Sequence, residues 1–169
     1  TRPLAPARAW RTALALRGIG SMIEPLLSYQ PRQNVLPAKT YQAVLFTSAA
    51  GTDYLPYAAL PAGWPDWLCY CVGAATAQAA RRQGWRQADS RGDNAGELAA
   101  WVAQTAAPQR GPLLWPCGLD HKAEPQASLQ GQGFIVEPWV VYAALAAEQL
   151  SPATVSALRQ GHIAVVLFT

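Results

Sequence analysis

The sequence predicts an α/β fold in which helices cover both faces of a parallel sheet. Three segments, residues 43–47, 68–73 and 165–169, are short and almost wholly apolar. Strands without polar alternation are typical of parallel sheets, because both of their faces are buried. Helical patterns alternate with these strands along the chain, as α/β folds require. Hydrophobic residues make up 51% of the chain, which is enough for a core and rules out intrinsic disorder.

The first half of the chain contains three helices and three extended segments whose ends are marked by Gly or Pro. In order, we predict a helix over 7–16, an extended segment over 22–27, a linker over 30–39, a strand over 43–47 followed by a helix, a strand over 68–73 and a helix over 75–83. Gly84 closes the last of these helices, since glycine readily adopts the conformation that ends a helix.

The second half contains the two clearest helix starts. Asn94 and Glu97 stand three residues apart, close to a capping box, and predict a helix over 94–106. Ser151 followed by Pro152 predicts another helix, which ends at Gly161. The remaining expected elements are a strand over 113–115, a weakly helical segment over 123–130, a strand over 134–142 interrupted by Pro138, and a last strand over 165–169.

A short repeat links the two ends of this pattern. The sequence Ala-Val-Leu-Phe-Thr at 43–47 recurs as Val-Val-Leu-Phe-Thr at 165–169. Each copy is expected to form a strand that leads into a loop of small residues, and the second copy stops where its loop should begin. The repeat therefore predicts two similar α/β units, the second of them incomplete in this sequence.

Charge is scarce and scattered. Charged residues make up 14% of the chain, against a usual share of about 25%. The formal net charge is +3, and among the basic residues only Arg81 and Arg82 are adjacent, which does not form the basic stripe of a nucleic-acid site. Apolar runs are interrupted well before the roughly 18 residues that a membrane span needs. We therefore expect binding to neither nucleic acid nor membrane.

The cysteines and histidines do not have metal-binding spacing. Cys69 and Cys71 flank one strand residue and should face the same side of the sheet, while Cys117, His121 and His162 lie far away in sequence. We interpret the thiols as small packing residues of a protein in the reducing cytosol. A cytoplasmic protein without a metal is the expectation.

Two loops between a strand and a helix are candidate anion sites. The backbone N–H groups at a helix start, together with the helix dipole, bind anions without Lys or Arg. Both loops follow parallel strands, whose carboxyl ends form the usual ligand edge of an open sheet. Ordinary helix capping by Ser48 or Thr76 is the alternative interpretation. The candidate substrate-binding residues are Thr47, Ser48 and Ala49 in one loop and Gly73, Ala74, Ala75 and Thr76 in the other.

Five segments in order along the chain resemble uroporphyrinogen-III synthases. They are residues 1–3 before the first helix, 45–49, 72–77, 140–142 after a long strand, and 164–169 after the Leu-Ser-Pro helix start. The resemblance implies two doubly wound, flavodoxin-like parallel-sheet domains joined by a two-stranded linker. The first would comprise residues 1–34 and 147–169, without its C-terminal part, and the inserted second domain residues 38–142. Residues 35–37 and 143–146 would be the linkers.

The resemblance also implies a reaction. The family converts hydroxymethylbilane, a linear tetrapyrrole rich in carboxylates, into uroporphyrinogen III by losing water and inverting ring D. It needs no cofactor and no metal. A small-molecule substrate is therefore expected, with hydroxymethylbilane synthase as a transient partner and a monomeric state.

Two side chains gain candidate roles from the resemblance. Tyr142 matches the tyrosine favoured as the catalytic residue of the family, and its phenol can donate a hydrogen bond to the leaving hydroxyl. The other interpretation of Tyr142 is a half-buried linker aromatic. Arg2 is the cation expected near the same cleft, where it would either face a substrate carboxylate or form a structural salt bridge.

The chain departs from the family pattern at two places, which keeps other functions open. Ala50 stands where the family commonly has Asn, and the loop 116–122 carries His121 and Lys122 in place of a Gly-Arg type loop. The alternative function is a non-catalytic two-lobed module that binds an anionic small molecule or a protein partner. A nucleotide-binding domain is disfavoured, because residues 73–76 contain neither the dinucleotide fingerprint nor the phosphate-loop Lys.

Overall fold

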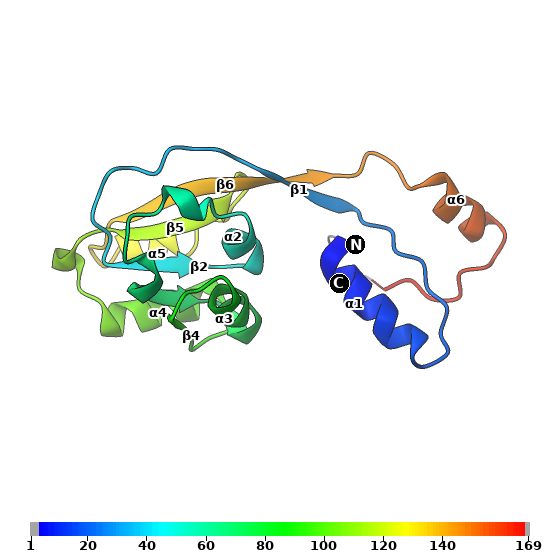
Figure 1. Ribbon diagram of the computed structural model, residues 1–169, viewed down its shortest axis with the longest axis horizontal. Coiled ribbons are helices and arrows are strands. Elements are labelled where there is room, and N and C mark those ends of the chain that lie inside the picture. Colours follow the sequence, from blue (N-terminus) through cyan, green and yellow to red (C-terminus); the bar gives the residue numbers. More distant parts are fainter. Residues whose placement is uncertain (1–3, 168–169) are drawn as a thin grey trace. The chain divides into compact units, whose positions relative to one another are not determined.

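The chain forms two units that share one long strand. The computed structural model describes residues 4–167, and contacts between residues divide them into a unit from Pro31 to Ala143 and a unit built from the residues up to Gln30 and from Ala144 onward (Figure 1). The larger unit contains most of the strands and the helices that cover them. Within residues 4–167, no helix is both long and apolar enough to cross a membrane.

The strands form one six-stranded sheet, most of which lies in the larger unit. Its strands lie in the order β1-β6-β5-β2-β3-β4, and the pairs from β6 to β4 are parallel, as predicted. The predicted apolar strands at 43–47 and 68–73 are confirmed as β2 and β3, and every residue of β2 is buried. The strand bounds are β1 Leu27–Pro31, β2 Ala43–Phe46, β3 Leu68–Cys71, β4 Gln87–Ser90, β5 Leu113–Gly118 and β6 Val136–Ala146.

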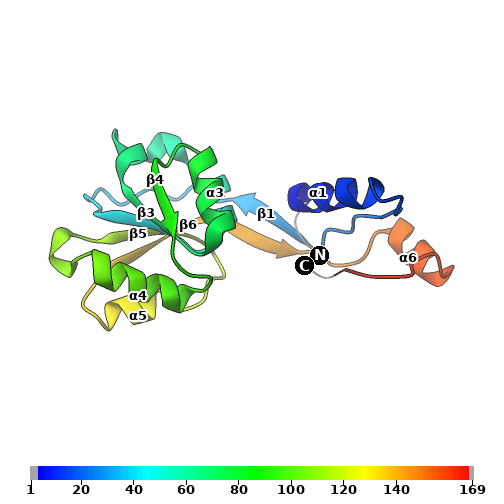
Figure 2. The same cartoon turned by 90° about the horizontal axis from the view of Figure 1, so that it is seen from below.

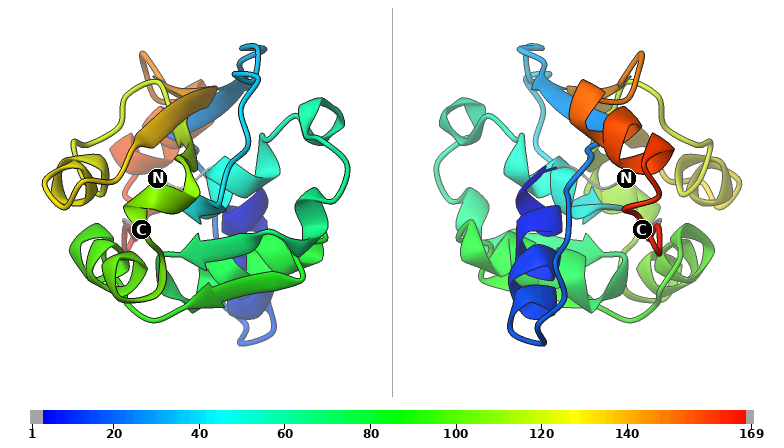
Figure 3. Two further views of the ribbon diagram at one scale, coloured as in Figure 1. Left: turned by 90° about the vertical axis from the view of Figure 1, so that its left-hand side faces the viewer. Right: turned by 90° about the vertical axis from the view of Figure 1, so that its right-hand side faces the viewer.

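Helices cover both faces of this sheet (Figure 2). On one face α2 (Ala49–Asp53) and α3 (Gly73–Arg82) pack against each other and against the strands, and on the other lie α4 (Ala95–Thr105) and α5 (Gln126–Gln130). Alternate residues of β2 belong to two separate hydrophobic clusters, one for each face. Figure 3 shows the same layers from either end. The order helix, sheet, helix is the predicted α/β class.

Local capping explains where the predicted helices begin. The Asn94 side chain accepts a hydrogen bond from the N–H of Glu97 at 3.0 Å, which confirms the predicted N-cap. The Glu97 carboxylate accepts from the N–H of Asp93, one residue before the position that a capping box requires. Short 3₁₀ turns at Tyr57–Ala59, Trp64–Asp66 and Pro108–Arg110 complete the connections.

Strand β4 was not expected from the sequence, and it corrects the flavodoxin-like expectation for this sheet. Counted from β2, the parallel strands lie in the order 3-2-1-4-5, whereas flavodoxin-like sheets have the order 2-1-3-4-5. Without β4 the remaining four strands would have followed the flavodoxin order. Its residues, Gln-Ala-Asp-Ser, are mostly polar because β4 lies at the edge of the sheet, so hydrophobic patterning could not reveal it.

Strand β6 continues past Pro138, where an interruption was expected. Proline lacks an N–H group and is tolerated in a strand that has no neighbour on one side. The N–H of Arg32 donates to the carbonyl of Val141, and the N–H of Ala147 donates to the carbonyl of Leu26. β1 therefore runs antiparallel to β6 and pairs only with its later part. At Pro138 the strand pairs with β5 alone among the described residues.

The smaller unit contains two helices and little other regular structure in its described part. Helix α1 (Leu4–Ala15) begins earlier than predicted, and α6 (Pro152–Arg159) begins at Pro152 with Ser151 as its N-cap, as predicted. The carboxylate of Glu24 also accepts bonds from the Ser151 backbone and hydroxyl, and these bonds lower the pKa of Glu24.

Two predictions of extended segments in the smaller unit are not confirmed: one strand begins later than predicted, and the other does not form in the described residues. Residues 22–26 are irregular, and the strand begins only at Leu27. Residues 165–167 form no strand and are more than half exposed, while 168 and 169 lie outside the described residues. A strand needs a neighbour for its backbone groups, and none is paired with 165–167 in the described part of the chain.

Candidate functional site

The strand order indicates at which edge of the sheet a ligand is expected. The chain builds β3 and β4 on one side of β2 and then β5 and β6 on the other, so the strand order reverses between β2 and β5. Ligands of open α/β sheets bind outside the carboxyl ends of the strands at such a reversal. The residues that follow β2, β3 and β5 meet at this edge, because these strands are parallel.

Two predicted site residues lie together at the reversal. Ser48 follows β2, is extended (φ −157°, ψ 156°) and caps α2, where its Oγ accepts from the N–H of Gly51 at 3.4 Å. The same Oγ lies 3.4 Å from the hydroxyl of Tyr142 on β6, and either group can be the donor. The two oxygens come from residues 94 positions apart in sequence. Ser48 is therefore both a helix cap and a partner of the Tyr142 phenol.

The Tyr142 ring is held from more than one side. It is half-buried, and the ring of Tyr54 lies 5.8 Å from it, centroid to centroid, at an angle of 43°. Gly118, the last residue of β5, lies opposite Tyr142 in the sheet. Sequence reasoning singled out neither Tyr54 nor Gly118, since both become relevant only through long-range packing.

Thr47 has a buried partner that the sequence analysis also missed. The indole Nε1–H of Trp115, in the middle of β5, donates to Thr47 Oγ1 at 3.3 Å. Because this bond occupies one lone pair of the Thr47 oxygen, the orientation of the hydroxyl is restricted. Ala49, the third candidate of this loop, is the half-buried first residue of α2.

The second predicted loop begins α3 without a side-chain cap. Gly73 adopts φ +71°, which favours glycine, and its N–H donates to the carbonyl of Gly92 at 2.8 Å. Its amide is therefore engaged within the protein. Ala74 and Ala75 are exposed, but Thr76 is buried. The prediction that the Thr76 hydroxyl is accessible to a ligand is therefore wrong. The carboxylate of Asp93 lies beside Gly73, with Oδ1 3.8 Å from where a Cβ would stand.

The thiols are unsuited to catalysis. Burial raises the pKa of Cys117 to about 12, so its thiol is neutral near pH 7. Cys69 and Cys71 face the same side of β3, as expected, and are buried with their sulfurs 3.7 Å apart. Burial also raises the pKa of Cys69. No cluster of three His, Cys, Asp or Glu residues suited to a metal occurs within residues 4–167.

Comparison with known proteins decides the family. A family model described as uroporphyrinogen-III synthase HemD matches residues 8–169. The chain belongs to the uroporphyrinogen-III synthase HemD family. This family consists of lyases that cyclise hydroxymethylbilane in tetrapyrrole biosynthesis.

Solved synthase structures share the fold. A mutant uroporphyrinogen III synthase from the extremely thermophilic bacterium Thermus thermophilus superposes with a TM-score of 0.59 at 16% identity, covering 96% of this chain and 70% of that one. Uroporphyrinogen-III synthetase from Helicobacter pylori 26695 gives 0.55 at 14% identity, covering 83% of this chain and 62% of that one. The chain thus spans about two thirds of these synthases. No curated protein matches the sequence.

Two cations, Arg2 and Lys39, are candidate partners for an acidic substrate. Arg2, the predicted cation, lies outside the described residues. Lys39 forms an ion pair with Glu137, which also accepts from the Tyr41 hydroxyl at 2.9 Å. The hydrogen bond from Lys39 lowers the pKa of Glu137. Lys39 is therefore committed to a structural pair.

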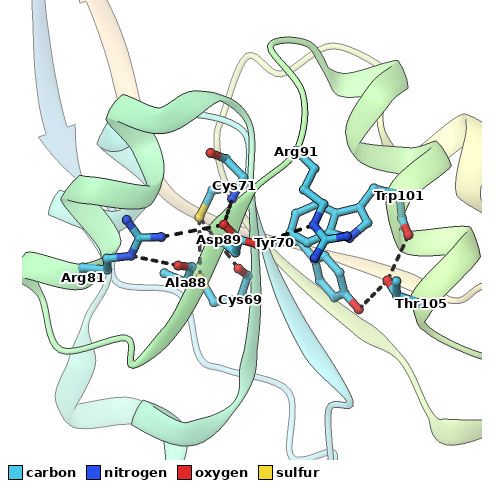
Figure 4. A network of polar contacts seen from close by, with 10 residues as sticks. Cys69, Tyr70, Cys71, Arg81, Ala88, Asp89, Arg91, Trp101 and Thr105 are labelled. Carbon is cyan, nitrogen blue, oxygen red and sulfur yellow. Dashed lines mark hydrogen bonds and ion pairs between the residues drawn. The ribbon is translucent and has the colours of Figure 1, made fainter.

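A cavity of about 300 Å³ lies elsewhere, beside the edge strand β4. Figure 4 shows its polar contacts: the Arg91 guanidinium lies 5.4 Å from the Trp101 ring centroid and 3.6 Å from Asp89, which also pairs with Arg81 at 3.8 Å. Tyr70 bonds Thr105 at 3.0 Å. Arg81 and Arg91 share the single carboxylate of Asp89, so this cluster keeps a net positive charge. Three strands separate β4 from β6 in the sheet. The cavity therefore differs from the Tyr142 site in both place and chemistry.

Proposed function

We propose that this chain forms the part of a uroporphyrinogen-III synthase that binds hydroxymethylbilane at the carboxyl edge of the β2–β6 sheet, with Tyr142 as the acid that assists loss of the hydroxyl. The observation that carries this proposal is the 3.4 Å approach of the Tyr142 and Ser48 hydroxyls at the strand-order reversal. Family membership supplies the reaction, and this pair supplies a hydroxyl donor where a ligand is expected.

The chemistry asks little of the protein beyond a proton donor and a defined shape. The terminal pyrrole stabilises the cation that forms when the hydroxyl leaves, so a neutral phenol is sufficient as donor. When Ser48 donates to the Tyr142 oxygen, the phenol proton goes to a partner other than Ser48, and we propose the leaving hydroxyl as that partner during the reaction. Closure with inversion of ring D then requires that the bound chain be held in one geometry.

Backbone amides are the proposed partners of the substrate carboxylates. Helix α3 starts without a side-chain cap, and Ala74 and Ala75 in its first turn are exposed, which suits anion binding at a helix N-terminus. Thr47 and Ser48 add hydroxyls from the neighbouring loop, with Ala49 as a backbone contact. Arg2 remains the proposed cation. Gly73 contributes its conformation, since its N–H is already bonded.

The smaller unit is proposed to be part of another α/β domain, the discontinuous first domain that the family resemblance implies. Support for this arrangement comes from the repeated strand sequences at 43–47 and 165–169. A transient contact with hydroxymethylbilane synthase is proposed as well, since that enzyme would supply the substrate. The small net charge of +3 gives no reason to expect a nucleic-acid partner.

The test is a coupled assay on the natural full-length protein, in which hydroxymethylbilane is made in situ and isomers I and III are separated. Tyr142→Phe should lower the rate of isomer III formation by about 100-fold, the usual scale of general acid catalysis. Tyr70→Phe is the matched control, because it removes a phenol that bonds Thr105 beside β4, and its rate should stay within about twofold.

Two outcomes would contradict the proposal. Formation of isomer I alone by the parent protein would favour a non-catalytic binding module. An unchanged rate in Tyr142→Phe would remove Tyr142 from the mechanism while leaving the family assignment intact.

A further inference from the structure

Position 118 carries a glycine for reasons of space. Gly118 is buried at the end of β5, and its φ is not among the positive values that glycines such as Gly73 adopt here. A Cβ at position 118 would lie 2.8 Å from Cε2, 2.9 Å from Cζ and 3.1 Å from the hydroxyl oxygen of Tyr142. Real Cβ atoms essentially never approach other atoms below 3.0 Å. The phenol therefore lies directly against the backbone of Gly118.

A register shift places Tyr142 at this position. β5 and β6 pair residue by residue from Leu113 to Cys117, and then Gly118 pairs with Tyr142 instead of Val141. Such irregularities re-aim side chains and are enriched beside active sites. The N–H of Leu119 donates to the carbonyl of Tyr142 at 2.8 Å, which fixes the shifted pairing.

The loop after β5 holds Gly118 in turn. Nδ1 of His121 lies 2.9 Å from the carbonyl oxygen of Gly118, and the His121 ring packs edge-on against Trp115 with centroids 4.9 Å apart. Tyr142 is therefore contacted by Tyr54 at its ring, by Ser48 at its hydroxyl and by the backbone of Gly118.

We propose that Gly118 is a positioning residue for the reaction: the absence of a side chain leaves room for the Tyr142 phenol and lets its hydroxyl lie near Ser48 and the substrate. This proposal rests on the proposed role of Tyr142. Any side chain at 118 must displace the ring or the strand end. A displacement of about 1 Å at a catalytic group can cost about 100-fold in rate.

Gly118→Ala in the full-length protein tests the proposal. We expect kcat for isomer III to fall about 10- to 100-fold with KM within about twofold, because substrate binding by the loops is retained. Gly131→Ala is the matched control in the same unit, since its Cβ would meet only ordinary contacts at 3.6 Å. Its kcat and melting temperature should match the parent.

Double variants separate positioning from general damage to the fold. In the Tyr142→Phe background, Gly118→Ala should cost less than about twofold more in kcat, because the phenol it positions is already gone. In the Tyr142→Ala background, where the ring is absent, Gly118→Ala should leave the melting temperature unchanged.

The outcomes distinguish this proposal from the proposed function. Impaired Tyr142→Phe together with fully active Gly118→Ala overturns the role of Gly118 alone. Equal losses of kcat from Gly118→Ala with and without the Tyr142 hydroxyl also overturn it. An unimpaired Tyr142→Phe overturns the catalytic role of Tyr142 and, with it, the positioning role of Gly118.

Discussion

Ser48 is the residue at which helix capping and catalysis can be separated. Its Oγ accepts from the Gly51 N–H at 3.4 Å and lies 3.4 Å from the Tyr142 hydroxyl, so one atom makes both the capping contact and the contact to the proposed catalytic residue. Substituting Ala removes both, whereas Gly removes the hydroxyl but is nearly as good an N-cap as Ser. Thr retains both the hydroxyl and the cap.

The structure sets the magnitudes. An N-cap bond is worth about 0.5–2 kcal/mol, and the 3.4 Å distance is long, so we expect Ser48→Ala to lose about 0.5–1 kcal/mol. That loss corresponds to about 1–4 °C in Tm for a chain of this size. The contact to Tyr142 is equally long, so we take the lower part of the range for a neutral hydrogen bond, about 0.5–1 kcal/mol, which corresponds to a loss of roughly two- to fivefold in kcat.

The assay compares Tm with kcat for isomer III across the three variants. We expect Ser48→Ala to lose both quantities, Ser48→Gly to lose kcat with Tm within about 1 °C of the parent, and Ser48→Thr to retain both. Full kcat in Ser48→Gly would refute the reasoning and leave Ser48 as a helix cap only. A loss of kcat that simply follows Tm would do the same.

Two further predictions concern carboxylates. Hydrogen bonds from Lys39 and Tyr41 hold the pKa of Glu137 below its usual 4.5, so their stabilisation is present above pH 4.5 and is lost as the pH falls through the lowered value. In urea unfolding, Glu137→Gln should therefore destabilise by about 1 kcal/mol at pH 7 and by progressively less as the pH falls below 4.5, and an equal loss at every pH would contradict this. Asp93 lies beside the start of α3, so Asp93→Asn should lower KM by about two- to threefold if that helix binds substrate carboxylates. Asp66→Asn, which breaks the exposed Arg86 pair, is its control, and an unchanged KM in Asp93→Asn would count against α3.

Hydrophobic patterning and capping residues predicted the elements that are defined by a few neighbouring residues. The strands β2 and β3 and the starts of α4 and α6 follow from apolar runs and caps that a few residues define. Pro138 and β4 could not be predicted in the same way, because both depend on which strands lack a neighbour. Residues 165–167 show the opposite error: they are apolar and were predicted as a strand, but they form no strand because no neighbouring strand pairs with them in the described part of the chain.

In the candidate site too, the residues that the sequence suggested differ from those that only the fold brings together. Thr47 and Ser48 became candidates from their place after a strand, and Tyr142 from the family resemblance, and all three remain proposals. The contacts that orient them, from Trp115, Tyr54 and Gly118, join distant parts of the chain. A register shift between β5 and β6 determines the most important of these, and a single sequence carries no signal for it.

The polar composition of β4 has a consequence for handling the protein. An open sheet edge is a template on which a second chain can add a strand and start aggregation. β4 places Asp89 on this edge, and Arg81 and Arg91 pair with it, so an added strand would have to accommodate these charges. Replacing Asp89 with Val would make the strand easy to predict from sequence, and it would also make the protein more prone to aggregate during expression.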